Sequence, residues 1–165
     1  MIRVDVRART SRYLPGEAFA LLSDFARYPQ HTDVVREVRV RRLDEQVVES
    51  QWWVRFRTGI LHWTEIDRID QGRLLIEFRQ SVGDLARFDG VWSVHPAAGG
   101  TQVVFEAEAD LGMPTLAPLL NPVAERTLRE TIREILTGLL GPDLSFDGDG
   151  QDPDRPAALL VAEAV

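Results

Sequence analysis

The 165-residue chain contains no cysteine and no lysine, and each absence excludes a class of chemistry. Without cysteine there is no disulfide, no thiolate nucleophile and no cysteine metal site. All 19 basic residues are arginine, so no side-chain amine is present to form a Schiff base. A chain without disulfides is what we expect of a cytoplasmic protein.

Long apolar runs are also missing. No stretch of about 18 apolar residues occurs, so we expect no membrane span. Ile2, Val4 and Val6 alternate with charged residues from the start of the chain, which indicates a strand and not a signal peptide. His31 and the other two histidines have no metal-ligand spacing, and there is no glycine-rich phosphate loop. We therefore expect no metal and no cofactor.

Positive charge is too scarce for a nucleic-acid partner. The formal net charge is −7, and residues 141–165 hold six acids against one arginine. The remaining residues are nearly neutral, whereas phosphate contacts need a basic face. Arginines at alternate positions, such as Arg39 and Arg41, are typical of a solvated sheet face.

Apolar alternation predicts seven strands, and helical spacing predicts three helices. The expected strands are residues 2–9, 37–41, 48–56, 60–69, 74–80, 88–95 and 103–111. Two short helical pieces are expected at 17–25 and 25–29, the second stopped by Pro29, and a long helix at 116–140 with Thr115 as its N-cap. Short turns such as Thr58-Gly59 favour antiparallel neighbours.

The long helix carries an apolar stripe that must be buried. Its members are Leu120, Ala124, Leu128, Ile132, Ile135 and Leu139. One helix laid over a curved sheet of seven strands cannot fill the whole concavity, so we expect an apolar cavity between them. The fold class is therefore α+β: a curved antiparallel sheet around a long C-terminal helix, with two short helices after the first strand.

Three sequence features resemble a known family. They are the stretch 83–96, with Gly83, Gly90, Trp92 and Pro96; the stretch 18–24 with Tyr28-Pro29; and the Gly100-Thr101 turn. The chain resembles the START-like superfamily (helix-grip, Bet v 1-like), in the branch of polyketide aromatase/cyclases and coenzyme Q-binding proteins. The resemblance implies one helix-grip domain over residues 1–141 that binds a hydrophobic or polyketide-like ligand. Residues 142–165 are predicted to be an acidic flexible tail.

The hairpin at Thr58-Gly59 decides which side chains face the cavity. A two-residue turn pairs Val54 with Trp63 and points Trp63 and Glu65 inward. A three-residue turn shifts the register by one residue and points His62 inward instead. We favour the first.

The two alternatives give different catalytic candidates. Burial raises the pKa of a carboxyl group, so Glu65 in an apolar pocket would serve as a general acid or base. The plainer interpretation is an exposed Glu65 paired with a surface arginine. His62 is the second candidate because histidine titrates near neutrality, although most lone strand histidines are merely solvated.

Large aromatic and polar side chains are the candidates for ligand contact. The predicted ligand-binding residues are Tyr28, Trp52, Val54, Phe56, Trp63, Phe78, Gln80, Trp92, Thr127 and Thr131. The aromatic residues would form a wall for a flat ligand, or would simply fill the core. The threonine hydroxyls would orient a ligand carbonyl, or bond to the carbonyl four residues back in their own helix. We expect Tyr28 near the mouth of the cavity.

These features lead to three functional hypotheses. The first is a cofactor-free polyketide cyclase/aromatase of secondary metabolism that acts by confinement and acid/base catalysis, with an acyl carrier protein as a candidate partner. The second is a non-catalytic carrier of a quinone, another isoprenoid or a lipid. The third is a protein-interaction module that uses the sheet surface and the acidic tail. We expect a monomer or a homodimer.

Overall fold

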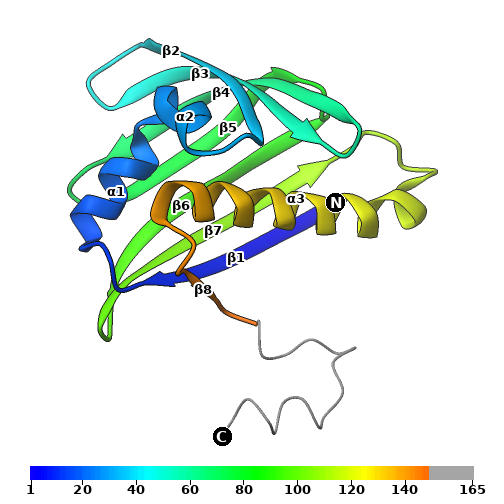
Figure 1. Ribbon diagram of the computed structural model, residues 1–165. Coiled ribbons are helices and arrows are strands. Elements are labelled where there is room, and N and C mark those ends of the chain that lie inside the picture. Colours follow the sequence, from blue (N-terminus) through cyan, green and yellow to red (C-terminus); the bar gives the residue numbers. More distant parts are fainter. Residues whose placement is uncertain (149–165) are drawn as a thin grey trace, which may run out of the picture.

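An antiparallel sheet curves around one long helix in the computed structural model, which describes residues 1–148 (Figure 1). The strands in chain order are β1 (Ile2–Thr10), β2 (Val35–Arg42), β3 (Val47–Phe56), β4 (Gly59–Asp70), β5 (Leu75–Gly83), β6 (Arg87–Ala97), β7 (Gly100–Asp110) and β8 (Ser145–Phe146). Their order across the sheet is β2-β3-β4-β5-β6-β7-β1-β8. The predicted α+β helix-grip fold is confirmed, with one strand more than expected.

The helices lie on the concave side of the sheet. They are α1 (Pro15–Ser23), the 3-10 turn η1 (Phe25–Arg27), α2 (Tyr28–His31) and α3 (Ala117–Leu140). Helix α3 runs along the concave face, while α1 and α2 lie near its C-terminal end (Figure 1). Among the described residues, no helix combines the length and apolar character that crossing a bilayer requires.

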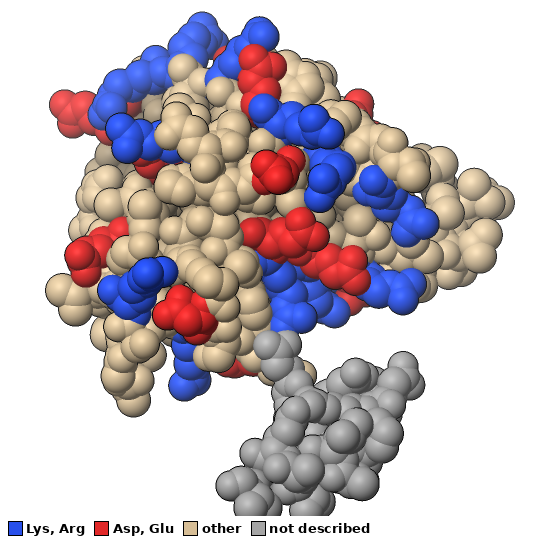
Figure 2. All heavy atoms as spheres, viewed as in Figure 1, with Lys and Arg blue, Asp and Glu red and all other residues tan. Residues whose placement is uncertain are grey.

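Alternating side chains give the sheet one buried and one solvated face. In β1, Ile2, Val4 and Val6 are buried, while the residues between them are exposed. Outward-facing Arg3 contacts Glu108 on the neighbouring strand at 3.3 Å. Basic and acidic side chains lie next to each other over much of the visible surface (Figure 2). The arginines therefore belong to a solvated face, as their spacing predicted.

Helix α3 is amphipathic, and its apolar side closes the concavity. Its buried residues are Ala124, Leu128, Thr131, Ile132, Ile135, Leu136, Leu139 and Leu140. The predicted stripe is therefore correct except at Leu120, which is half-buried near the helix start. Burying a large apolar side chain contributes about 1.5–3 kcal/mol, so this stripe holds the helix on the sheet.

Two predicted helix boundaries are wrong. The N-cap of α3 is Leu116 and not Thr115, and no side-chain hydrogen bond caps the helix. Pro29 does not stop a helical piece but lies in the first turn of α2. Proline is tolerated there because first-turn N–H groups have no intrahelical acceptor. A proline is common both in the first turn of a helix and just after a helix end, so the sequence pattern did not tell these two positions apart.

The beginning of the predicted flexible tail is part of the sheet. Ser145 and Phe146 pair with Arg9 and Ala8 of β1, and the Arg133 guanidinium lies 4.5 Å from the centre of the Phe146 ring. The two-residue strand was missed because it offers no alternation to detect. The rest of the predicted acidic tail, residues 149–165, lies outside the described residues.

The β3–β4 hairpin turns one residue earlier than predicted. Arg57 and Thr58 form the turn, and Arg57 has a φ of 58°. Trp52 therefore pairs with Trp63, and Val54 with Leu61, instead of the predicted Val54–Trp63 pair. The shift is by two residues, so Trp63 still points inward. Pairing the two indoles outweighs the turn preference of Gly59, because cross-strand aromatic pairs stabilise a sheet.

A glycine lets α3 approach α2 closely. A Cβ at Gly138 would overlap the carbonyl oxygen of His31. We expect Gly138→Ala to lower the free energy of unfolding by about 1–3 kcal/mol, because the added methyl group must push α3 away from the backbone of α2. The matched control is Gly16→Ala, where a Cβ meets no atom within 4 Å. Urea unfolding checks both, and an equal loss in the two variants would contradict this packing argument.

Candidate functional site

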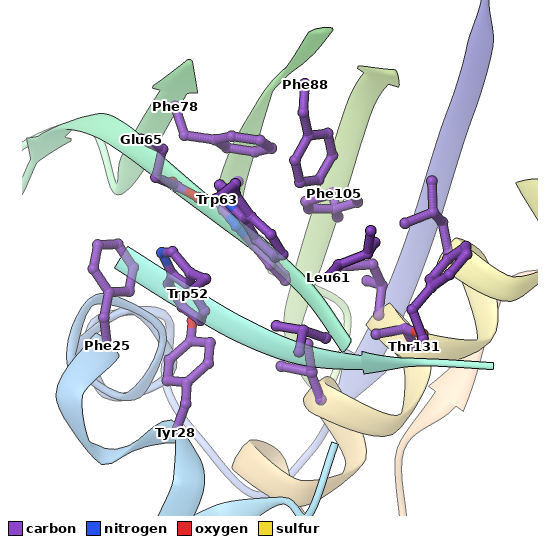
Figure 3. Close-up of a pocket in the computed structure, with 16 residues that line it drawn as sticks. Phe25, Tyr28, Trp52, Leu61, Trp63, Glu65, Phe78, Phe88, Phe105 and Thr131 are labelled. Carbon is purple, nitrogen blue, oxygen red and sulfur yellow. Dashed lines mark hydrogen bonds between the residues drawn. The ribbon is translucent and has the colours of Figure 1, made fainter. Parts of the chain in front are cut away.

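An apolar cavity lies between the sheet and α3, and aromatic side chains form most of its wall (Figure 3). Its lining comes from η1, α2, α3 and strands β3 to β7. The lining residues are Phe25, Tyr28, Trp52, Val54, Phe56, Leu61, Trp63, Glu65, Phe78, Phe88, Trp92, Phe105, Leu128, Thr131, Ile132 and Ile135. Phe56 and Leu61 are the partly exposed members, so the cavity meets solvent beside the β3–β4 hairpin.

The cavity is narrow because its aromatic rings contact one another. The space open to the centre of a water molecule is about 50 Å³. Trp52 and Trp63 are stacked, with ring centroids 6.0 Å apart and planes at 6°. Phe88 packs edge-on against Trp63 at 5.4 Å. A ligand must therefore be flat and apolar, or it must displace some of these rings.

Glu65 contributes the carboxyl group of the cavity lining. It lies on the concave side of β4, is 5% exposed, and accepts a hydrogen bond from Trp63 Nε1 at 2.7 Å. It forms no ion pair with any arginine or histidine in the described part of the chain. The predicted inward direction of Glu65 is therefore correct, although the strand register differs by two residues, and the alternative of an exposed, arginine-paired Glu65 is wrong.

A second carboxyl group lies behind Glu65. Asp67, two residues further along β4, is fully buried and does not line the cavity. Its Oδ2 accepts a hydrogen bond from Ser50 Oγ at 2.5 Å, and Ser50 Oγ in turn accepts one from Trp52 Nε1 at 2.8 Å. Both stacked indoles therefore donate their N–H groups to one polar cluster of Ser50, Glu65 and Asp67, which is otherwise enclosed by apolar side chains.

Burial raises the pKa of both carboxyl groups. For Glu65 the pKa lies well above its ordinary value, because burial, the hydrogen bond to Asp67 and the Asp67 charge all favour the neutral form. The Asp67 pKa is raised by burial, but the hydrogen bonds from Glu65 and Ser50 oppose the rise. Both carboxyl groups therefore hold a proton more strongly than an exposed carboxyl does.

Tyr28 is a buried part of the cavity wall, although the sequence led us to expect it near the mouth. It is 1% exposed, and its hydroxyl donates to the carbonyl oxygen of Leu22 at 2.6 Å. Burial raises its pKa well above the usual value, and the charges of Glu65 and Asp67 add to the rise. Tyr28 therefore stays neutral and presents its ring to the cavity.

Nine of the twelve predicted site residues line the cavity, and three do not. Those in the lining are Tyr28, Trp52, Val54, Phe56, Trp63, Glu65, Phe78, Trp92 and Thr131. The alternation of β3 and β4 was sufficient to place most of them. Phe78 and Trp92 belong to later strands, where the same alternation applies.

His62 points away from the cavity. Its ring stacks on Trp53 with centroids 4.3 Å apart, and its Nδ1 lies 2.9 Å from the carbonyl oxygen of Trp52. The register that would turn His62 inward is therefore wrong. Since side chains alternate between the two faces of a strand, an inward Trp63 requires an outward His62.

The three polar ligand candidates have mixed outcomes. Gln80 donates to the carbonyl oxygen of Leu85 at 2.8 Å and lies outside the lining. Thr127 also lies outside it, and its hydroxyl bonds to Val123 at 2.9 Å. Thr131 lines the cavity, but its hydroxyl donates to the carbonyl of Thr127 at 2.8 Å. Both threonines therefore follow the back-bonding alternative.

Asp67, the partner of Glu65, was not among the predicted site residues. It follows Glu65 at i+2 and so shares its face, and Ser50 pairs with Glu65 from β3. The strand period alone would have grouped Glu65 with Asp67, whereas the addition of Ser50 depends on the pairing of β3 with β4. The cavity lining also includes residues that were not among the predicted ligand-binding residues, such as Phe25, Leu61, Phe88 and Phe105. No cluster of three or more metal-ligating side chains occurs within residues 1–148.

We predict that the Glu65 carboxyl makes stability pH-dependent. Its pKa is raised in the folded state, so its contribution is present at acidic pH and is lost as pH rises from the ordinary carboxyl pKa through the raised one. Glu65→Gln should therefore gain stability relative to wild type between pH 5 and pH 8. Urea unfolding across this range measures it, with exposed Glu77→Gln as control. Parallel curves for wild type and Glu65→Gln would contradict the raised pKa.

Solved structures share this architecture at low sequence identity. TTHA0849 from Thermus thermophilus superposes with a TM-score of 0.77 at 23% identity, covering 83% of this chain and 93% of that one. The Zhui aromatase/cyclase from Streptomyces sp. R1128 gives 0.66 at 18%, covering 85% and 92%. A START superfamily protein from Mycobacterium smegmatis gives 0.64 at 18%, covering 84% and 96%. These likenesses show the fold.

No curated protein is significantly similar to the chain in sequence. The family model described as "Polyketide cyclase / dehydrase and lipid transport" matches residues 12–136, which span α1 through most of α3 and include every residue of the cavity lining. The chain therefore belongs to the polyketide cyclase/dehydrase and lipid transport family.

Proposed function

We propose that the protein binds a flat, hydrophobic small molecule in the cavity and promotes its cyclisation or dehydration by proton transfer at Glu65. The observation that carries the proposal is a carboxyl group, 5% exposed, set in an aromatic wall without a cationic partner among the described residues. A carboxyl whose pKa is raised toward neutrality is suited to general acid/base work. The family and the shared fold of the Streptomyces aromatase/cyclase support the same reaction class.

The chemistry requires one group that both gives and takes a proton. A protonated Glu65 donates its proton to a ligand carbonyl oxygen while the carbon of an enol in the same ligand attacks the carbonyl carbon. The resulting carboxylate then accepts the enol O–H proton, which restores the enol's ketone and the acid. One C–C bond forms, one hydroxyl replaces the carbonyl, and no cofactor enters the balance. The stacked Trp52 and Trp63 would hold a planar ring system next to the carboxyl.

Binding without chemistry is the second candidate. It is favoured by the hydroxyls of Tyr28 and Thr131, which are committed to backbone carbonyls and leave few groups to act on a substrate. The family description also includes lipid transport. A carrier of a quinone or a lipid would use Glu65 only to orient one ligand oxygen. The acyl carrier partner and the interaction-module hypothesis stay predictions.

Native mass spectrometry of the purified protein, followed by organic extraction, is the first test. A co-purifying aromatic ketide or quinone, displaced by an added naphthyl ketone, would support the cavity as the binding site. A protein that carries nothing and takes up no apolar probe over the accessible concentration range would refute binding.

We predict that a larger side chain at the cavity mouth weakens ligand uptake. Leu61→Trp adds volume to a lining side chain, so it should weaken the binding of 2-acetylnaphthalene at least about tenfold, a loss of roughly 1.4 kcal/mol. Ile60→Trp, one residue away on the outer face, is the matched control and should bind as wild type does. Fluorescence titration measures both. Equal affinities in the two variants would show that the ligand binds outside the cavity.

We predict that Glu65→Gln separates catalyst from carrier. The amide keeps the shape of the side chain but cannot donate and recover a proton. Cyclisation of an aryl 1,3,5-triketone, followed by liquid chromatography, should fall by about 10²–10⁴-fold if Glu65 is the acid/base group. Affinity for 2-acetylnaphthalene should change far less. A wild-type protein that binds the triketone without accelerating its cyclisation would establish the carrier alternative.

A further inference from the structure

The second buried carboxyl, Asp67, lies at a position where an apolar side chain would fill the space equally well, so packing alone does not explain it. It is fully buried between Val48 of β3 and Phe78 of β5, on the same face of β4 as Glu65. An ionisable group in such a place costs free energy unless it is paired or hydrogen-bonded. No arginine or histidine of residues 1–148 forms an ion pair with it.

The hydrogen bonds around Asp67 define where protons can lie. Ser50 Oγ accepts the N–H of Trp52, so its single hydroxyl proton is directed to Asp67 Oδ2. Asp67 Oδ2 is therefore an acceptor. The other oxygen, Oδ1, is buried and has no conventional donor in the described residues. A carboxylate with one satisfied oxygen and one orphaned oxygen needs a further proton donor.

Glu65 is the group that meets this need. Its Oε1 accepts the N–H of Trp63, which leaves its other oxygen to carry a proton. Glu65 and Asp67 interact through their side chains. A protonated Glu65 can therefore donate to Asp67, whose Oδ1 has no other donor among the described residues. Two adjacent buried carboxylates would repel each other strongly, whereas a pair that shares one proton does not.

The other ionisable groups near the pair do not change this assignment. Tyr28 from α2 faces both carboxyls and is neutral, and Asp24 acts on Tyr28 from the end of α1. On β5, the residue opposite Glu65 is the uncharged Gln80. No positive charge among these groups would favour a doubly ionised pair.

We propose that Asp67 is a positioning residue that keeps one proton on Glu65, with Ser50 and Trp52 holding Asp67 as the ionised member. The proposal rests on the proposed function, because the proton it places is the one that Glu65 would deliver. At neutral pH the cavity then presents a carboxylic acid next to a buried negative charge. It takes uncharged ketones or phenols and rejects carboxylates of the same size.

Infrared titration of the ligand-free protein tests the proton assignment. The carbonyl stretch of a protonated carboxyl should persist in wild type at pH values where exposed carboxyls, such as Glu77, are ionised. Glu65→Gln should remove this band, and Glu77→Gln should not. In Asp67→Asn the Glu65 band should disappear at a lower pH than in wild type, because the negative charge of Asp67 no longer opposes ionisation of Glu65. A purely structural Asp67 would leave the Glu65 titration where it is.

Ser50→Ala gives an independent test should Asp67→Asn fold poorly. Loss of the Ser50 donor weakens the preference of Asp67 for its ionised form. On acidification, a second protonated-carboxyl band should therefore appear at higher pH than in wild type. A wild-type band that survives Glu65→Gln would place the proton on Asp67, and would overturn the proposal. So would an unchanged titration in both Asp67→Asn and Ser50→Ala.

Ligand selection is measured with two probes that share one ring system, 2-acetylnaphthalene and 2-naphthoate. At neutral pH, wild type should bind the ketone at least about tenfold more tightly than the naphthoate. The naphthoate loses one hydrogen bond to the site, and its charge is repelled by that of Asp67. Asp67→Asn should lose ketone affinity at neutral pH and recover it on acidification. Equal affinity for the naphthoate would overturn the selection. If neither probe binds, the proposed function fails while the infrared result still decides the proton pair.

Discussion

The stacked pair of Trp52 and Trp63 connects the fold to the site. Their cross-strand pairing fixes the register of β3 against β4, and this register decides which side chains of both strands face the helix. The same two indoles donate N–H groups to Ser50 and Glu65. A buried indole N–H needs an acceptor and a buried carboxyl needs a donor, so a hydrogen bond between the two satisfies both groups. Large apolar area and polar satisfaction are thus supplied by the same residues.

The polar cluster lowers the stability of this core, because its groups lose hydration on burial. Ser50, Glu65 and Asp67 lie where apolar residues would pack without desolvation cost. Burial of two carboxyl groups is tolerated because neighbours donate hydrogen bonds and because one proton can neutralise half of the pair. Groups with strongly perturbed pKa values are concentrated at functional sites, which is why the cluster and not the surrounding aromatic wall carries the functional proposal.

The narrowness of the cavity bears on what the protein accepts. About 50 Å³ admits little more than a few water-molecule centres, and rings such as Phe88 and Trp63 occupy the rest. A flat ligand can enter by replacing ring–ring contacts with ligand–ring contacts of similar strength. A bulky or charged ligand would lose these contacts without compensation. Under the proposed function, the aromatic wall would select ligands by shape, and the carboxyl pair would select them by charge and by their ability to accept a proton.

The sequence by itself determined the α+β architecture, the amphipathic α3 and the inward direction of Trp63 and Glu65, because alternation and helical spacing record which face is buried. It left the register of the hairpin open, and it gave no sign of β8, whose two residues pair only because β1 offers a free edge. The outward placement of His62 and the hydrogen bond from Ser50 of β3 to Asp67 of β4 were decided by tertiary structure. Strand pairing sets which side chains from different strands meet, and no local pattern encodes that distance.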